Sequence, residues 1–276
     1  MRNLVLAVHG SAVPDADATG GRLAVRRLPR TGLATEALPH AGPAVERLPH
    51  AGPATERLPH AGPAVERLAE AVRRLTGAPV AVGHLDHRTP SLPDVLADRP
   101  GAVVVPLLLG DGYHRTVDIP AVARHFDCVV TRGLSGEHAV ALALHDRLRA
   151  AERAAGGPAD AVVVAGAGSS RPGGNDGTLT AVRQLGALLP VPVTAAYCSA
   201  SAPGPAEAVA RLHARGFRRV ALATHLLAPG RFTRALAPVP GVWAVGEPLA
   251  DHPRLAGLVA ARYAGAAPAG RGARAA

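Results

Sequence analysis

The sequence VVVPLLLGDGYHRTVDIP, residues 103–120, carries the pattern that decides the fold. Its first six residues form a short, largely β-branched apolar run, typical of a strand buried on both faces of a parallel sheet. A glycine turn follows at 110–112, and a helical pattern opens at Thr116. The stretch therefore predicts a strand, a turn and a helix. His114 is expected in the loop beyond the carboxyl end of the strand, where open α/β sheets bind their ligands.

Two further apolar runs end in polar residues in the same way. Residues 4–8 form a predicted strand that is followed at once by His9, and residues 79–85 form another that is followed by Asp86. Parallel strands deliver their carboxyl ends to one edge of the sheet. If the three strands are parallel neighbours, we expect His9, His114 and Asp86 to converge on one cleft.

Residues 27–66 consist of four ten-residue units, RLPRTGLATE, ALPHAGPAVE, RLPHAGPATE and RLPHAGPAVE. The last three units each carry two prolines and a glycine, which break helices and remove ladder hydrogen bonds. We predict an extended or partly turned surface insert, with helix resuming from about 64 to 75. The histidines of the units lie ten residues apart, too far for one site on an extended chain, and we interpret them as incidental rather than as a metal-binding tract.

A larger duplication relates the two halves of the chain. The pattern around His9 returns at 161–169 and the pattern around His114 returns at 220–232, with Ala167 and Phe232 in place of the two histidines. The predicted organisation is an amino-terminal lobe over 1–155, which contains the 27–66 insert and the histidines, and a carboxyl-terminal lobe over 156–264. Residues 265–276 are predicted to be a flexible tail.

Each half has the predicted order β-α-β-α-β-α-β. A long helix over about 137–154 closes the first half and a helix over about 253–264 closes the second. Alternating strands and helices imply an α/β fold with a four-stranded parallel sheet in each lobe and right-handed crossovers. The predicted strands lie near 3–8, 79–85, 102–108 and 128–132 in the first half, and near 160–166, 192–198, 219–225 and 242–246 in the second.

Composition narrows the classes of function. The 30 basic residues are all arginine and give a net charge of +9, but they are scattered and aromatic residues make up only 3% of the chain, which disfavours nucleic-acid binding. Cys128 and Cys198 have no CxxC spacing and are expected to be reduced. No apolar run approaches the roughly 20 residues of a membrane span, and the first run is too short for a signal peptide. We expect a soluble cytoplasmic protein.

Three motifs resemble those of the sirohydrochlorin chelatases, the ATP-independent class II chelatases of sirohaem and cobalamin synthesis. They are AVHGS at 7–11, GHLDHRTPSLPDVL at 83–96 and VVVPLLLGDGYHRTVDIP at 103–120. The resemblance implies a bilobal α/β protein that inserts Co²⁺ or Fe²⁺ into sirohydrochlorin between its lobes, with no cofactor beyond the substrate metal ion. His9 and His114 match the family's metal-binding and catalytic histidines. Asp86 stands where many members carry glutamate and is the candidate third ligand.

The residue types suit this reaction. Neutral imidazole binds borderline ions such as Co²⁺ and Fe²⁺ and can also accept a pyrrole proton. Two histidines and one carboxylate hold an ion without closing a four-ligand cage, so the ion can leave. The carboxylates of the substrate give a purpose to cleft arginines. The candidate substrate-binding residues are Arg88, Arg115, Arg171, Arg231, Ser11 and Tyr113, of which Ser11 is also suited to capping a helix.

Other functions remain open at this point. One is a non-catalytic two-lobed carrier of a tetrapyrrole or a metal. A phosphoryl-transfer enzyme with His9 as nucleophile is disfavoured, because no arginine directly precedes His9 and no matching acid motif is present. The residues do not choose among cobalt, iron and nickel. Neither do they choose between a monomer and a homodimer, and no nucleic-acid or membrane partner is expected.

Overall fold

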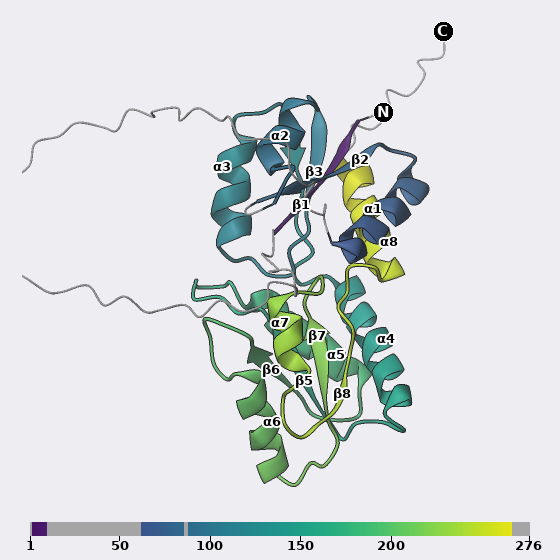
Figure 1. Ribbon diagram of the computed structural model, residues 1–276, viewed down its shortest axis with the longest axis vertical. Helices are drawn as coiled ribbons and strands as arrows, with labels where there is room; N and C mark the ends of the chain where they lie inside the picture. Colours follow the sequence, from purple (N-terminus) through teal and green to yellow (C-terminus); the bar gives the residue numbers. More distant parts are fainter. Residues whose placement is uncertain (1, 10–61, 86–87, 267–276) are drawn as a thin grey trace, which may run out of the picture. The chain divides into compact units, whose positions relative to one another are not determined.

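The computed structural model describes residues 2–9, 62–85 and 88–266 (Figure 1). Ser11, Asp86, the insert up to residue 61 and the tail beyond residue 266 lie outside the described residues. Within the described ranges, no helix is both long enough and apolar enough to cross a bilayer.

The first sheet has four parallel strands in the order β2-β1-β3-β4. They are β1 (Leu4–Val8), β2 (Val80–His84), β3 (Ala102–Pro106) and β4 (Cys128–Val130). Leu4 of β1 pairs with Val80 on one side and with Val103 on the other. Every residue of β1 and β3 is buried, as expected for strands whose two faces are both covered. The prediction that β1, β2 and β3 are parallel neighbours is confirmed.

Helices connect these strands, and local sequence sets where they begin and end. They are α1 (Pro63–Thr76), α2 (Leu92–Ala97), α3 (Ile119–Ala123) and α4 (His138–Ala154). Helix α1 has proline in its first turn and ends at Gly77, which adopts the left-handed conformation that favours glycine. Helix α2 begins at Ser91, whose side chain accepts from the Asp94 N–H, while the Asp94 carboxylate accepts from the Ser91 N–H.

The second sheet repeats the first, with the strand order β6-β5-β7-β8. Its elements are β5 (Ala161–Gly166), α5 (Asp176–Leu188), β6 (Val193–Tyr197), α6 (Pro205–Ala214), β7 (Val220–His225), α7 (Arg231–Leu236), β8 (Val242–Val245) and α8 (Pro253–Ala266). Ala165 pairs with Thr224 as Ala7 pairs with Pro106 in the first sheet. The predicted fold class, two parallel four-stranded sheets in duplicated halves, is confirmed.

The two long helices each pack on the opposite half. Helix α4 contacts β7, β8 and α5, whereas α8 contacts α1 and β3 (Figure 1, where yellow α8 lies beside α1). One apolar cluster accordingly includes Leu148 of α4 and Val259 of α8 together with Leu68, Val105 and Ala223. The predicted domain boundary between residues 155 and 156 therefore lies between the two sheets in sequence, but α4 and α8 each pack on the sheet from the other side of this boundary.

Candidate functional site

The His9 and His114 rings lie in tilted contact at the carboxyl edge of the first sheet. His9 follows β1 directly and is exposed, and His114 lies beyond the neighbouring strand β3. Their ring centroids are 4.4 Å apart and the ring planes are inclined by 39°. Two imidazoles that bind one ion through bonds of about 2.1 Å have centroids roughly 5 Å apart. The predicted convergence of the two histidines is confirmed.

The sequence pattern predicts that His114 lies in a loop, and this is wrong. His114 is the first residue of a π-helical turn, η1 (His114–Asp118). The Ile119 N–H donates to the His114 carbonyl, five residues back. Pro120 explains the wide turn, because proline has no N–H and its ring clashes with the carbonyl four residues earlier in a regular α-helix. The helix therefore begins two residues before the predicted start at Thr116.

Asp118 is a candidate site residue that the sequence analysis did not include. Its Oδ2 lies 2.6 Å from Nδ1 of His114, and each of the two side chains is about one third exposed, 34% for His114 and 33% for Asp118. The available signal was the spacing, since residues four apart share one face of a helix. The Asp118 carboxylate thus contacts Nδ1 of the imidazole from the same helical segment.

Tyr113 of the first half and Arg171 of the second half are in contact next to His114. The Arg171 guanidinium carbon lies 5.6 Å from the centroid of the Tyr113 ring, which is 53% exposed. The Tyr113 ring meets the His114 ring edge-on at 6.4 Å between centroids. Of the predicted substrate-binding residues, these two therefore adjoin the histidine pair. A guanidinium over an aromatic face keeps its charge available to an anion.

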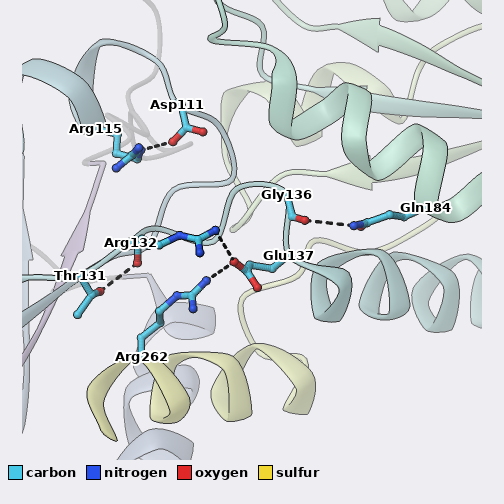
Figure 2. Close-up of polar contacts among 8 residues, drawn as sticks. All are labelled: Asp111, Arg115, Thr131, Arg132, Gly136, Glu137, Gln184 and Arg262. Carbon is cyan, nitrogen blue, oxygen red and sulfur yellow. Dashed lines mark hydrogen bonds and ion pairs between the residues drawn. The ribbon is translucent and has the colours of Figure 1, made fainter. Parts of the chain in front are cut away.

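The other predicted arginines are placed differently. Arg115 lies next to His114 in sequence, but its Nε donates to the Asp111 carboxylate (Figure 2). Arg231 begins α7, is exposed and lies over the Phe232 ring at 5.0 Å. Arg88 is half-buried. Arg115 is therefore already paired with an anionic side chain.

The loops beyond β3 and β5 touch each other. A Cβ built on Gly110 would lie 3.0 Å from the Gly174 carbonyl oxygen, and one on Gly112 would lie 3.5 Å from Oγ of Ser169. The loop beyond β5 is braced in turn, because the Asn175 amide donates to the Ser169 carbonyl at 3.0 Å and to the Ser201 hydroxyl at 2.9 Å. The loop beyond β5, which lies against the loop before His114, is thus held by its own hydrogen bonds.

The loop at 131–137 is also tied to both halves, as Figure 2 shows. Glu137 accepts from Arg132 at 3.3 Å and from Arg262 of α8. The Gly136 carbonyl accepts from Gln184 of α5 at 3.1 Å. A Cβ on Gly133 would lie 3.4 Å from Cδ of Arg115, so this loop supports the side chain that follows His114.

The second half has a histidine of its own near the end of β7, but it faces the core. His225 is only 3% exposed, and its Nδ1 lies 3.1 Å from Oγ1 of Thr178. Burial lowers the pKa of His225 to about 4, which keeps the imidazole neutral. No group of three or more His, Cys, Asp or Glu side chains suited to a metal occurs in the described ranges, and His9 and His114 stay the candidate metal ligands that the sequence predicts.

Comparison with known proteins gives independent evidence on the family. The model of the CbiX family matches residues 56–151 and again residues 161–266. The structure of SirB from Bacillus subtilis with Fe³⁺ is 19% identical, covers 95% of this chain and 94% of that chain, and has a TM-score of 0.61. SirB from Bacillus subtilis subspecies spizizenii in complex with cobalt is 17% identical over 96% of this chain and 94% of that one, with a TM-score of 0.60.

A third similar structure is that of CbiX described as the terminal enzyme of sirohaem biosynthesis in denitrifying bacteria. It is 18% identical, covers 96% of this chain and 99% of that chain, and has a TM-score of 0.61. At such identities the three structures show a shared fold. No curated protein sequence matches the chain.

Proposed function

The chain belongs to the CbiX family, and from this premise we propose that it is a sirohydrochlorin chelatase that inserts a divalent metal ion into the tetrapyrrole without ATP. The observation that supports the proposal most directly is the 4.4 Å separation of the His9 and His114 rings at an open sheet edge. No other pair of histidine rings in the described ranges is in such contact. Similar chains have been solved with iron and with cobalt, which supports Fe²⁺ or Co²⁺ as the substrate metal.

In the proposed reaction the two imidazoles receive the hydrated ion and replace part of its water shell. Nitrogen ligands hold Co²⁺ and Fe²⁺ well, yet two of them leave most of the coordination sphere open for transfer to the four pyrrole nitrogens. Asp86 is proposed as a third, charged ligand. As the ion enters the macrocycle two pyrrole protons must depart, and each freed imidazole can accept one.

The substrate would be oriented by its carboxylates. Arg171, stacked on Tyr113, is the best-placed cation because it projects from the second half toward the first. Arg115 would contribute if a substrate carboxylate displaced Asp111 from its Nε. Arg88, Arg231 and Ser11 remain proposed substrate contacts. Charge-assisted pairs of this kind position a polyanionic substrate and also select it.

The first prediction tests the histidines. His9→Ala and His114→Ala should each lower the rate of cobalt insertion into sirohydrochlorin by about 10²-fold or more, because each removes a ligand and a proton acceptor. The absorption spectrum of the tetrapyrrole follows insertion, and circular dichroism checks that the fold persists. His125→Ala is the matched control, since His125 is an exposed histidine of the same half.

Full activity in both site variants would refute the proposal. Binding of sirohydrochlorin by the unaltered protein with no spectral change on addition of Co²⁺ or Fe²⁺ would instead favour a non-catalytic carrier. The same assay with each metal in turn identifies the ion that is inserted.

A further inference from the structure

We propose that Asp118 is a positioning residue that holds the His114 imidazole in the tautomer protonated at Nδ1, so that Nε2 is the nitrogen offered to the metal ion. The role of Asp118 in metal insertion rests on the proposed function, whereas the tautomer is a property of the protein alone.

Asp118 and His114 touch through their side chains. Oδ2 of Asp118 lies 2.6 Å from Nδ1 of His114, at the short end of the range for a hydrogen bond between a ring N–H and a carboxylate. An ionised carboxylate can only accept. The contact is therefore attractive only when Nδ1 carries a proton, and the single lone pair of the neutral ring must then be on Nε2.

The backbone of η1 brings the two side chains into contact. Within η1 the two residues are four apart, and Pro120 just beyond prevents a regular α-helical turn at this place. Neither side chain is buried, so the ring is held by its own helical segment and not by a surrounding core. The position of Asp118 thus depends on the local turn that also sets the position of His114.

The contact bears on the tautomer of the neutral His114 ring. Free neutral histidine in water favours the tautomer with the proton on Nε2, the nitrogen that the Asp118 contact leaves for the metal. A carboxylate on Nδ1–H reverses this preference and restrains rotation of the ring. His114 would then accept an ion without first moving a proton, which matters where the ion must be bound and released in each turnover.

A simpler reading is that the pair is an ordinary surface contact between residues four apart on a helix, worth about 0.3–0.5 kcal/mol. Asp111, in the loop just before η1, and Arg115 provide a matched comparison, because they have the same spacing in sequence and are similarly exposed, 32% and 35%. Removing Asp111 deletes the same charge from the same region but leaves the contact with His114 intact. Only the positioning role predicts that the two aspartates differ in their effect on the ring.

The decisive measurement is nitrogen-15 NMR of the metal-free protein with labelled histidine, at about pH 8, where ordinary imidazoles are neutral. The His114 signals are identified by their loss in His114→Ala. In the unaltered protein they should show a protonated Nδ1 and an unprotonated Nε2. Asp118→Ala should shift His114 mainly to the Nε2–H form, and Asp111→Ala should not.

Co²⁺ titration of the same proteins gives the second readout. Asp118→Ala should weaken binding about 10–100-fold, the usual effect of removing the carboxylate behind a metal-binding histidine. Asp118→Asn, which keeps an oxygen that can accept from Nδ1–H, should fall between Asp118→Ala and the unaltered protein. Circular dichroism of each variant establishes that it is folded.

The proposal is wrong if His114 keeps the Nδ1–H form in Asp118→Ala, or if Co²⁺ affinity changes by less than about twofold. Failure of the proposed function looks different. If the tautomer and the affinity respond as expected but the unaltered protein inserts no metal into sirohydrochlorin, the positioning role stands and the chelatase assignment falls.

Discussion

His225 and Leu107 occupy matching positions in the two halves, one residue beyond the paired positions Thr224 and Pro106. Both are buried, with exposed fractions of 3% and 1%. The half that carries the candidate site thus has an apolar residue here, and the other half has an imidazole. Because burial prevents hydration of the charged form, the pKa of His225 falls to about 4.

This lowered pKa predicts acid sensitivity, with a definite sign. An unfolded chain takes up a proton at this imidazole near pH 6.5, but the folded protein does so only near pH 4, so protons favour unfolding in between. The stabilisation is complete above about pH 6.5 and is lost as the pH falls toward 4. Between about pH 7 and pH 5 we expect His225 to account for a loss of about 2 kcal/mol in the free energy of unfolding.

Urea unfolding at the two pH values checks this expectation in the unaltered protein and in His225→Leu, which installs the residue of the matching position. The variant should lose less stability on acidification, whatever its stability at neutral pH. Burial also lowers the pKa of His252, so only the difference between the two proteins reports on His225. Equal losses in both would contradict the prediction.

Single residues were predictable where a strand end exposed them. His9, His114, Tyr113 and Arg171 were predicted from the sequence as candidate site residues because each follows a recognisable apolar run, and the structure brings them together, while their roles stay proposals. Asp118 was not, because its pairing with His114 requires a helix that already includes residue 114. The roles of Asp86 and Ser11, outside the described residues, stay predictions.

At the scale of elements, the amino-terminal end of helix α5 lies close to loops of the first half. Gly177, its second residue, is buried, and a Cβ there would lie 2.2 Å from the Leu109 carbonyl oxygen and 2.6 Å from Oγ of Ser135. Both neighbours belong to loops of the first half. Glycine is therefore required for the amino-terminal end of α5 to sit against the loop that leads to His114.

Gly177→Ala should lower the free energy of unfolding by about 1–3 kcal/mol, because the added methyl group has no room. Gly186→Ala is the matched control in the same helix, since its nearest neighbours would lie 3.9 Å away. That variant should be neutral or more stable by about 0.5–1 kcal/mol, because alanine favours helix. Denaturant unfolding of both variants measures the difference, and an equal effect would show that the approach at Gly177 is not restrictive.

Elements with a strong pattern were predicted well. All eight predicted strands overlap the observed ones, and the predicted helices at 64–75, 137–154 and 253–264 correspond to α1, α4 and α8. Short helices such as α2 and α7 have six residues each, too few to show a period. The π turn at His114 was not predicted, because an apolar period near 3.6 does not distinguish a π turn from an α-helix. Pro120 was the one sequence signal for it.

At the scale of the whole molecule, α4 of the first half packs on the second sheet and α8 of the second half packs on the first sheet. This exchange of helices joins the halves. Asp251, just before α8, accepts from Arg67 of α1 at 2.7 Å and from Arg147 of α4 at 2.5 Å. Burial tends to raise the pKa of Asp251, but the Arg67 hydrogen bond and the two guanidinium charges hold it below its usual range. The sequence could not reveal the exchange, because an amphipathic pattern shows that a helix face is buried but not which sheet buries it.

The exchange predicts that neither half is stable alone. A chain divided between Gly156 and Gly157, in the exposed turn after α4, should give two fragments that are each largely unfolded. Mixed, they should co-purify and regain helical circular dichroism, because each supplies the helix that covers the other's sheet. Cooperative unfolding of the isolated 1–156 fragment would show that α8 is dispensable.

The placement of α8 also orders events during synthesis. A nascent chain can form β1 and β3 long before residues 253–266 leave the ribosome. Until α8 is made, part of the apolar face of the first sheet therefore stays exposed to water. Folding of the half that holds the histidines should therefore finish only after translation of α8, and a product terminated before Pro253 should be bound by chaperones or degraded.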